Sequence, residues 1–428
     1  MSKFQLVFTG IFGAFILIGV LVFAFSRSST TDEVAHVTIW GSMSETLFNS
    51  YLRESGIAED KTIDITYVEK KRQTFDQEFV EALAVGQGPD LFFLTQDGIL
   101  KHKDKIYPIP FSVYSERTFK DTFVEEGELF LTNDGVYGLP FIIDPMVMYW
   151  NRDIFSNAGL SLPPKYWSEF YDLSNKLTVK DANFNVSRGT VALGEHGNIT
   201  NANELISLLV MQAGSPITIR NSQGVVENVF SDRFDLPTTP ALRALTFYTE
   251  FANPLKPFYS WNRALPESKN FFISGDLAMY FGFASELPDL RLKNPNLNFD
   301  VAAMPQTKDY TKNITFGRMV GLAIPRNSQK IAQAYRVASV LTGATSISEL
   351  AKITGLPPVR RDLLAFKPAE QYSSLFYEVA IQSRAWLAPE PARLNPIFKD
   401  MIESVTSGRT NIDQSIFKTS EQLDTILR

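Results

Sequence analysis

The chain offers few side chains suited to catalysis. It has no cysteine and only three histidines, which excludes thiol nucleophiles, zinc–thiolate sites and iron–sulfur clusters. Adjacent acids such as Glu125 and Glu126 have the chemistry of a glycosidase carboxylate pair, but among 47 acidic residues we expect them to be solvated at the surface. No phosphate-binding loop, nucleophile elbow or HExxH helix motif occurs. The residues therefore predict no enzyme activity and no metal or cofactor site.

Length and charge narrow the class of protein further. The chain of 428 residues is two to three times a typical domain of roughly 150 residues, which predicts at least two compact units. Its 41 basic and 47 acidic residues give a formal net charge of −6. A nucleic-acid partner requires a basic face, so we expect none.

An uncharged apolar segment near the N-terminus indicates the compartment. Residues 4–25 contain no charged side chain, and a helix of this length spans roughly 33 Å, enough to cross a bilayer. We expect residues 1–33 to form a transmembrane anchor followed by a polar tether. The alternative is a signal sequence cleaved near Ala24-Phe25-Ser26. Either interpretation places residues 34–428 outside the cytoplasm.

Hydrophobic patterning predicts an α/β fold. Apolar runs at residues 37–40, 63–68 and 91–94 are typical of strands, and helical periodicity lies between successive runs. Ser42 precedes Glu45 at the spacing of a capping box, so we expect Ser42 to cap the first helix. Further helices are predicted at about 167–177, 241–251 and 331–341, and the last 60 residues read as helices punctuated by prolines.

A series of short motifs runs through most of the chain in a fixed order. They are Gly86-Gln-Gly-Pro-Asp90, Asp134–Pro140 with the following FIIDPMVMYWNRD, Pro163–Glu169, Ser274–Tyr280, Val301–Pro305, Gly321–Pro325 and Thr354–Arg360. In this order they resemble the extracellular solute-binding proteins of ABC transporters, in the family that includes maltose-binding protein. The resemblance extends over residues 34–410.

This resemblance implies the type II periplasmic-binding-protein fold, in which two α/β lobes close around a solute at a hinge. It implies one lobe of about 34–142 and 318–365 and a second of about 146–315 and 372–428. In such open α/β sheets the ligand lies at the carboxyl ends of the strands.

The resemblance also suggests which side chains face the cleft. Trp40 and Ser42 follow the first strand, where a ring or a helix N-terminus can meet a ligand, although both also suit a core and a capping role. Asp97 and Asp144 lie where sugar-binding relatives use acids. Gly317 resembles the first residue of a hinge-crossing glycine pair, whose second glycine is replaced here. The remaining candidates are two aromatic residues, a serine and three arginines: Trp261, Phe283, Ser285, Arg318, Arg360 and Arg393.

Together these observations predict a monomeric, membrane-anchored receptor that captures a carbohydrate or a related polar solute for an ABC permease. Within the binding class, the alternative is a different solute, such as a polyamine, a phosphate ester or a metal chelate. From another class, the alternative is a glycan-active enzyme that uses carboxylates in the cleft. A sensor ectodomain that binds a solute without delivering it is a third alternative.

Overall fold

The computed structural model describes residues 34–308 and 312–427. The predicted anchor and tether, residues 1–33, lie outside the described residues. Within the described part, no helix combines the length and the apolar character needed to cross a membrane.

The described chain alternates strands and helices, as the patterning predicts. The strands are β1 (Ala35–Gly41), β2 (Ile63–Glu69), β3 (Leu91–Thr95), β4 (Ile109–Pro110), β5 (Gly135–Val136), β6 (Leu139–Asn151), β7 (Val179–Lys180), β8 (Val186–Val191), β9 (Thr218–Arg220), β10 (Val226–Asn228), β11 (Leu277–Phe283), β12 (Phe299–Ala302), β13 (Thr315–Ala323) and β14 (Ser383–Arg384). The α-helices are α2 (Glu45–Glu54), α3 (Phe75–Ala84), α4 (Ile99–His102), α5 (Glu116–Thr122), α6 (Arg152–Asn157), α7 (Phe170–Leu177), α8 (Ala202–Gln212), α9 (Pro240–Glu250), α10 (Ser268–Ile273), α11 (Leu287–Lys293), α12 (Ile331–Leu341), α13 (Ala344–Thr354), α14 (Arg361–Leu364), α15 (Gln371–Ile381), α16 (Pro391–Thr406) and α17 (Ile412–Leu427). Short 3₁₀ helices are η1 (Ile57–Glu59), η2 (Gln96–Gly98), η3 (Lys103–Lys105), η4 (Glu125–Phe130), η5 (Trp167–Glu169) and η6 (Ala284–Glu286).

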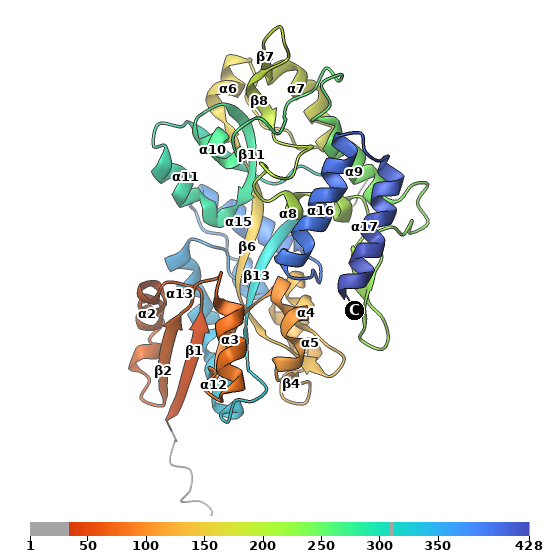
Figure 1. The fold of residues 1–428 in the computed structure, drawn as a ribbon. Coiled ribbons are helices and arrows are strands. Elements are labelled where there is room, and N and C mark those ends of the chain that lie inside the picture. Colours follow the sequence, from red (N-terminus) through yellow and green to blue (C-terminus); the bar gives the residue numbers. More distant parts are fainter. Residues whose placement is uncertain (1–33, 309–311, 428) are drawn as a thin grey trace, which may run out of the picture.

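The main sheet is mixed and continuous through the molecule. Its strand order is β2-β1-β3-β13-β6-β11-β8-β7, with β12 paired to β6 and β14 paired to β13. β1 is parallel to β2 and β3, whereas β13 and β6 are antiparallel to each other. Figure 1 shows β6 and β13 running from the part that contains β1, β2, α3 and α12 into the part that contains β8, β11, α7 and α10.

Buried apolar side chains form two clusters, which we call the first and the second cluster. The first cluster takes residues from 35–143 and 319–364, with Ala380 and Leu387. The second takes residues from 146–316 and 376–423 apart from those two. The chain passes from one cluster to the other between Ile143 and Met146 of β6, and again between Phe316 and Met319 of β13.

The local signals of the N-terminal helices are only partly those expected. α2 buries Phe48, Tyr51 and Leu52 on one face, and α3 ends just before Gly86, whose φ of +72° suits glycine. The predicted cap was wrong, because Ser44 rather than Ser42 accepts the backbone N–H of Leu47. The helix therefore begins one half-turn later than the capping-box spacing indicates.

Candidate functional site

Two candidate residues face each other where the chain passes between the clusters. In the antiparallel pairing of β6 and β13, Asp144 lies directly opposite Arg318, and Gly317 lies opposite Pro145. Residues directly opposite each other in a sheet share a face. The pairing of β6 with β13 therefore places a carboxylate and a guanidinium group side by side on one face of the sheet.

Asp144 is a buried carboxyl group held by one residue. The backbone N–H of Ser285 donates to its Oδ1 at 2.9 Å, and the Ser285 hydroxyl donates to its Oδ2 at 2.5 Å. Burial raises the pKa of Asp144 from 3.8 to about 6, although the hydrogen bonds from Ser285 and the positive charge of Arg318 act in the opposite direction. Above pH 6 the group is mainly a carboxylate, and each of its two oxygens can accept a further hydrogen bond.

Arg318 is fixed along one edge of its guanidinium group. Its Nη2 donates to Asn201 Oδ1 at 3.0 Å and forms an ion pair with Glu204. Its Cζ lies 3.8 Å from the centre of the Phe283 ring, a cation–π contact. The side chain is still 41% exposed, so part of the guanidinium group remains accessible to a ligand.

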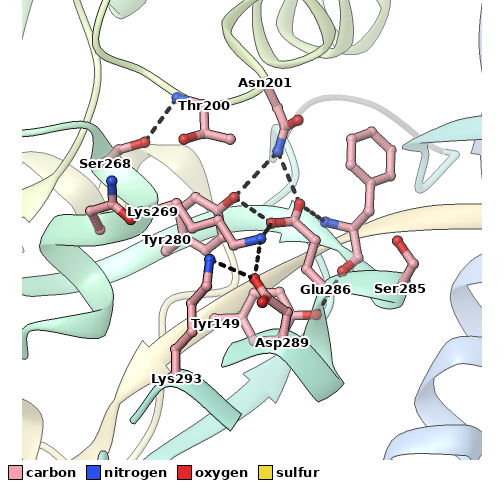
Figure 2. A network of polar contacts seen from close by, with 12 residues as sticks. Tyr149, Thr200, Asn201, Ser268, Lys269, Tyr280, Ser285, Glu286, Asp289 and Lys293 are labelled. Carbon is pink, nitrogen blue, oxygen red and sulfur yellow. Dashed lines mark hydrogen bonds and ion pairs between the residues drawn. The ribbon is translucent and has the colours of Figure 1, made fainter. Parts of the chain in front are cut away.

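Glu286 lies at the centre of a network of polar contacts beside Asn201 and Ser285 (Figure 2). Its carboxylate accepts hydrogen bonds from the Tyr280 hydroxyl at 2.7 Å, from the Phe283 backbone at 2.9 Å and from Asn201 Nδ2 at 3.2 Å. Lys269 Nζ lies 2.9 Å from the same carboxylate. These contacts tie α8, α10, β11 and η6 together, which orders the loops that carry Asn201 and Ser285.

We call Asp144, Asn201, Glu204, Phe283, Ser285 and Arg318 the polar cluster. The structure brings together four of the residues that the sequence predicted, Asp144, Phe283, Ser285 and Arg318. Phe283 is fully buried and supports the Arg318 guanidinium group, so its ring is not presented to solvent.

Three further candidates lie at or just after the carboxyl ends of neighbouring strands. Trp40 of β1 pairs with Phe92 of β3, so Ser42 and Asp97 come after adjacent parallel strands. Trp40 is 9% exposed and carries Lys70 Nζ 3.9 Å from its ring centre. Gln96, next to Asp97, bonds to the backbone of Gly317 and Met319 and so attaches η2 to β13. A ligand role for Trp40, Ser42 and Asp97 stays a prediction.

Three candidates lie outside the polar cluster. Trp261 is fully buried in the second cluster, where its indole N–H donates to Asn198, so stacking on a ligand was a wrong expectation. Arg360 binds the Asp362 carboxylate and the Thr342 carbonyl, which fixes the start of α14. Arg393 is exposed on the first turn of α16 and makes no side-chain hydrogen bond to the described residues.

Asn201, Glu204 and Glu286 were missed by the sequence reasoning. Asn201 and Glu204 stand three residues apart at the start of α8, a spacing typical of helix N-termini, after the loop that follows β8. Their proximity to Arg318 depends on contacts across more than 110 positions of sequence. Glu286 carries no local signal that separates it from other surface acids.

Metal binding finds no support in the described residues. No group of three or more histidine, aspartate or glutamate side chains within 34–308 and 312–427 is arranged to hold an ion. The histidines pair instead with other side chains, His36 with Asp64, His102 with Asp76 and His196 with Asn203.

β6 and β13 join the two apolar clusters, and the polar cluster lies where these paired strands pass from one apolar cluster to the other. Small-molecule sites often lie at such a boundary between two parts of a protein. Residues 48–346 match the model of the bacterial extracellular solute-binding protein family. The chain belongs to that family, and so to a class of extracytoplasmic binding proteins.

Individual relatives are distant but cover the chain almost completely. A protein of Brucella abortus (strain 2308) described as a binding protein is 21% identical over 417 residues, which make up 96% of this chain and 95% of the relative. An ABC transporter solute-binding protein from Thermotoga lettingae, solved with α-D-tagatose bound, is 22% identical with a TM-score of 0.68, covering 92% of this chain and 100% of its own. The sugar-binding protein of Xanthomonas citri is 18% identical with a TM-score of 0.73, covering 92% and 97%.

A cyclo/maltodextrin-binding protein solved with maltotetraose has a TM-score of 0.74 at 15% identity, covering 93% of this chain and 98% of its own. At these identities the solved structures establish the fold, which is that of the periplasmic binding proteins. The fold class inferred from the motifs is thereby confirmed for the described residues.

Proposed function

We propose that the chain is the solute-binding component of an ABC transporter and that its solute is a carbohydrate or a related polyhydroxylated molecule. The polar cluster is the observation that carries this proposal. Sugar hydroxyls both donate and accept hydrogen bonds, and Asp144 supplies acceptors beside the remaining N–H donors of Arg318. The fold relatives solved with tagatose and maltotetraose support the same class of solute.

Binding would close the two parts of the molecule on the solute. We infer that the first cluster belongs to a lobe of about 34–142 and 318–365, and the second to a lobe of about 146–315 and 372–428. β6 and β13 would act as the hinge, because each contributes to both clusters. A solute favours closure only by the contacts that it makes better in the closed state.

A thermal-shift screen tests the proposed solute class. At 100 times the dissociation constant, a sugar should add about 2.7 kcal/mol to the free energy of unfolding. For a folded region of this size, that corresponds to a rise of about 3 °C in melting temperature. Polyamines, phosphate esters and metal chelates in the same screen represent the alternative solutes. A shift with one of these and none with any sugar would overturn the carbohydrate assignment.

The same sugars separate a receptor from an enzyme. Each sugar that raises the melting temperature should be recovered unchanged after prolonged incubation, as judged by chromatography. Formation of shorter or dehydrated products would show that the cleft carboxylates catalyse a reaction.

We also propose that residues 4–25, which lie outside the described residues, anchor the chain in the membrane with residues 34–428 on the extracytoplasmic side. The protein should then remain in the membrane fraction after a high-salt wash, with an intact mass near 48.2 kDa. A soluble product lacking about the first 26 residues, the outcome of signal-peptide cleavage, would refute the anchor.

A further inference from the structure

The balance of charge around Arg318 bears on which sugars the polar cluster can hold. Arg318 is the only cationic side chain of the cluster, which also contains two carboxylates, Asp144 and Glu204. Glu204 forms an ion pair with Arg318, and Asp144 lies directly opposite Arg318 in the sheet. Burial acts to lower the pKa of this guanidinium group, but the negative charges of Glu204, Asp144 and Glu286 raise it above its usual value. Carboxylates of the protein therefore already balance the positive charge of Arg318.

The lysines beside the polar cluster are engaged with carboxylates as well (Figure 2). Lys269 Nζ lies 2.9 Å from a carboxylate oxygen of Glu286 and 2.9 Å from one of Asp289. Lys293 Nζ lies 3.2 Å from the same Asp289 carboxylate. Neither lysine therefore adds an uncompensated positive charge to the site.

The histidine near Glu204 is uncharged at neutral pH. Burial lowers the pKa of His196 from its usual 6.5. The negative charges of Glu403 and Glu204 and the hydrogen bond with Asn203 act in the opposite direction, and the positive charge of Lys399 adds to the lowering. The imidazole ring is therefore mainly neutral at pH 7 and does not attract an anion.

Glu126 lies on the other face of the sheet. Successive residues of a strand point to opposite faces, and a Cβ atom on Gly317 would meet Glu126, whereas the next residue of β13 belongs to the polar cluster. This carboxyl group is only 2% exposed, so the expectation that Glu125 and Glu126 are both solvated at the surface is wrong for Glu126. Burial raises its pKa from 4.5 to about 8, against the positive charge of Arg384 and together with the negative charge of Asp144. At pH 7 it mainly keeps its proton and adds no charge to the site.

A solute that carries its own negative charge would meet this arrangement unfavourably. To bind Arg318, the carboxylate of such a solute would have to lie close to the carboxylates of Glu204 and Asp144. Like charges at such short range repel each other, and charges placed against the wrong ligand are a common source of specificity. A sugar hydroxyl instead accepts a hydrogen bond from a remaining N–H group of Arg318 without adding a charge.

Glu204 is the acid whose charge can be removed with the least disturbance. Within the described residues its carboxylate forms a hydrogen bond or ion pair with Arg318 only, at Nη2. Asp144, in contrast, also holds the backbone and the hydroxyl group of Ser285. A glutamine at position 204 keeps an acceptor oxygen for Nη2 and loses only the charge.

We propose that Glu204 makes the polar cluster select uncharged sugars and exclude anionic ones such as uronates. It balances the charge of Arg318, whose remaining N–H groups then serve as donors to hydroxyl groups. Without the Glu204 charge, Arg318 becomes a group that binds the carboxylate of a sugar. The inference rests on the proposed sugar site and adds the charge class of its solute.

Matched pairs of sugars test this selectivity at pH 7.5, where Asp144 is mainly a carboxylate. The pairs are glucose with glucuronate, galactose with galacturonate, and galactobiose with digalacturonate, each titrated by calorimetry at low ionic strength. Each neutral sugar that binds the unaltered protein should do so at least about tenfold more tightly than its uronate. In Glu204→Gln, uronate affinity should rise and the ratio of the two affinities should shift at least about tenfold toward the uronate. A merely structural role of Glu204 would lower both affinities of a pair alike and leave their ratio unchanged.

Further variants assign the gain to Arg318. Adding Arg318→Met to Glu204→Gln should remove the gained uronate affinity, because the guanidinium group that pairs with the carboxylate is absent. Adding Arg117→Met instead, on α5 with a side chain 92% exposed, is the matched control and should leave the gain unchanged. Glu421→Gln, at an exposed position of α17, removes a charge of the same sign elsewhere and should keep the selectivity of the unaltered protein.

Two results would overturn the proposal. One is a uronate that binds the unaltered protein as tightly as its neutral partner. The other is a folded Glu204→Gln variant whose uronate affinity does not rise, including one that binds no uronate. The preference of the unaltered protein decides the matter if Glu204→Gln does not fold. Failure of the proposed function looks different, because no neutral sugar then binds the unaltered protein, whereas a gain of uronate binding in Glu204→Gln still reports the role of Glu204.

Discussion

The Arg318→Met variant is expected to bind its sugar roughly 10- to 150-fold more weakly than the unaltered protein. A charged hydrogen-bond donor to a ligand contributes about 1.5–3 kcal/mol, and its removal also leaves Glu204 and Asn201 without their donor. The sugar is the one with the largest thermal shift in the screen, and its dissociation constant is measured by calorimetry.

Stability measurements separate a loss of binding from a loss of folding. The Arg318–Glu204 pair is partly exposed, so the variant should lose at most about 1 kcal/mol of unfolding free energy. Arg318→Lys keeps the charge without the planar fork and should have an intermediate affinity. Arg117→Met serves again as the control. Full affinity in a folded Arg318→Met protein would exclude the guanidinium group from the sugar site.

The Gly317→Ala variant is expected to lose about 1–3 kcal/mol of unfolding free energy, the usual cost of overpacking a filled interior. The added Cβ would lie 1.8 Å from Glu126 Oε2 and 2.6 Å from its Cδ, and all of the nearest atoms belong to this one side chain. The carboxyl group is buried, so the clash is relieved only if Glu126 shifts within the protein interior. Urea unfolding measures the change.

A second substitution identifies the cause of that loss. In the Glu126→Ala background, Gly317→Ala should cost at least about 1 kcal/mol less, because the atoms that clash have been removed. Gly197→Ala is the matched control, since its nearest neighbour would lie 3.7 Å away, and it should change stability by less than about 0.5 kcal/mol. If the double variant is as unstable as the sum of the single ones, Glu126 does not set the requirement for glycine.

Local pattern was sufficient for most of the regular structure near the N-terminus. The alternating or continuous apolar runs at 37–40, 63–68 and 91–94 became β1, β2 and β3, and the stripe at 331–341 became α12. Periodicity reports which side chains are buried, and burial is what stabilises these elements. The cap was misplaced because Ser42 and Ser44 have the same capping chemistry, and only backbone geometry separates them.

The sequence predicted those residues of the polar cluster that follow recognisable motifs. Asp144, Ser285 and Arg318 follow recognisable motifs. The fold brings them together where the paired strands β6 and β13 pass from one cluster to the other. Trp261 was placed in the cleft because no hydrophobic stripe includes it, yet it packs in the second cluster. A loop aromatic residue gives no sequence signal that separates a core ring from a ligand-facing one.

The sequence by itself determined the α/β class, the family and the candidate acids and arginines, because these depend on residue type, period and order along the chain. Only the tertiary structure decided that Glu204 and Asn201 hold Arg318, and that Glu126 is buried against Gly317 while Glu125 is exposed. Adjacent glutamates are identical in sequence terms. The raised pKa of Glu126 arises from desolvation, and the contacts of both side chains involve strands far apart in the chain, so they exist only once the two clusters have packed.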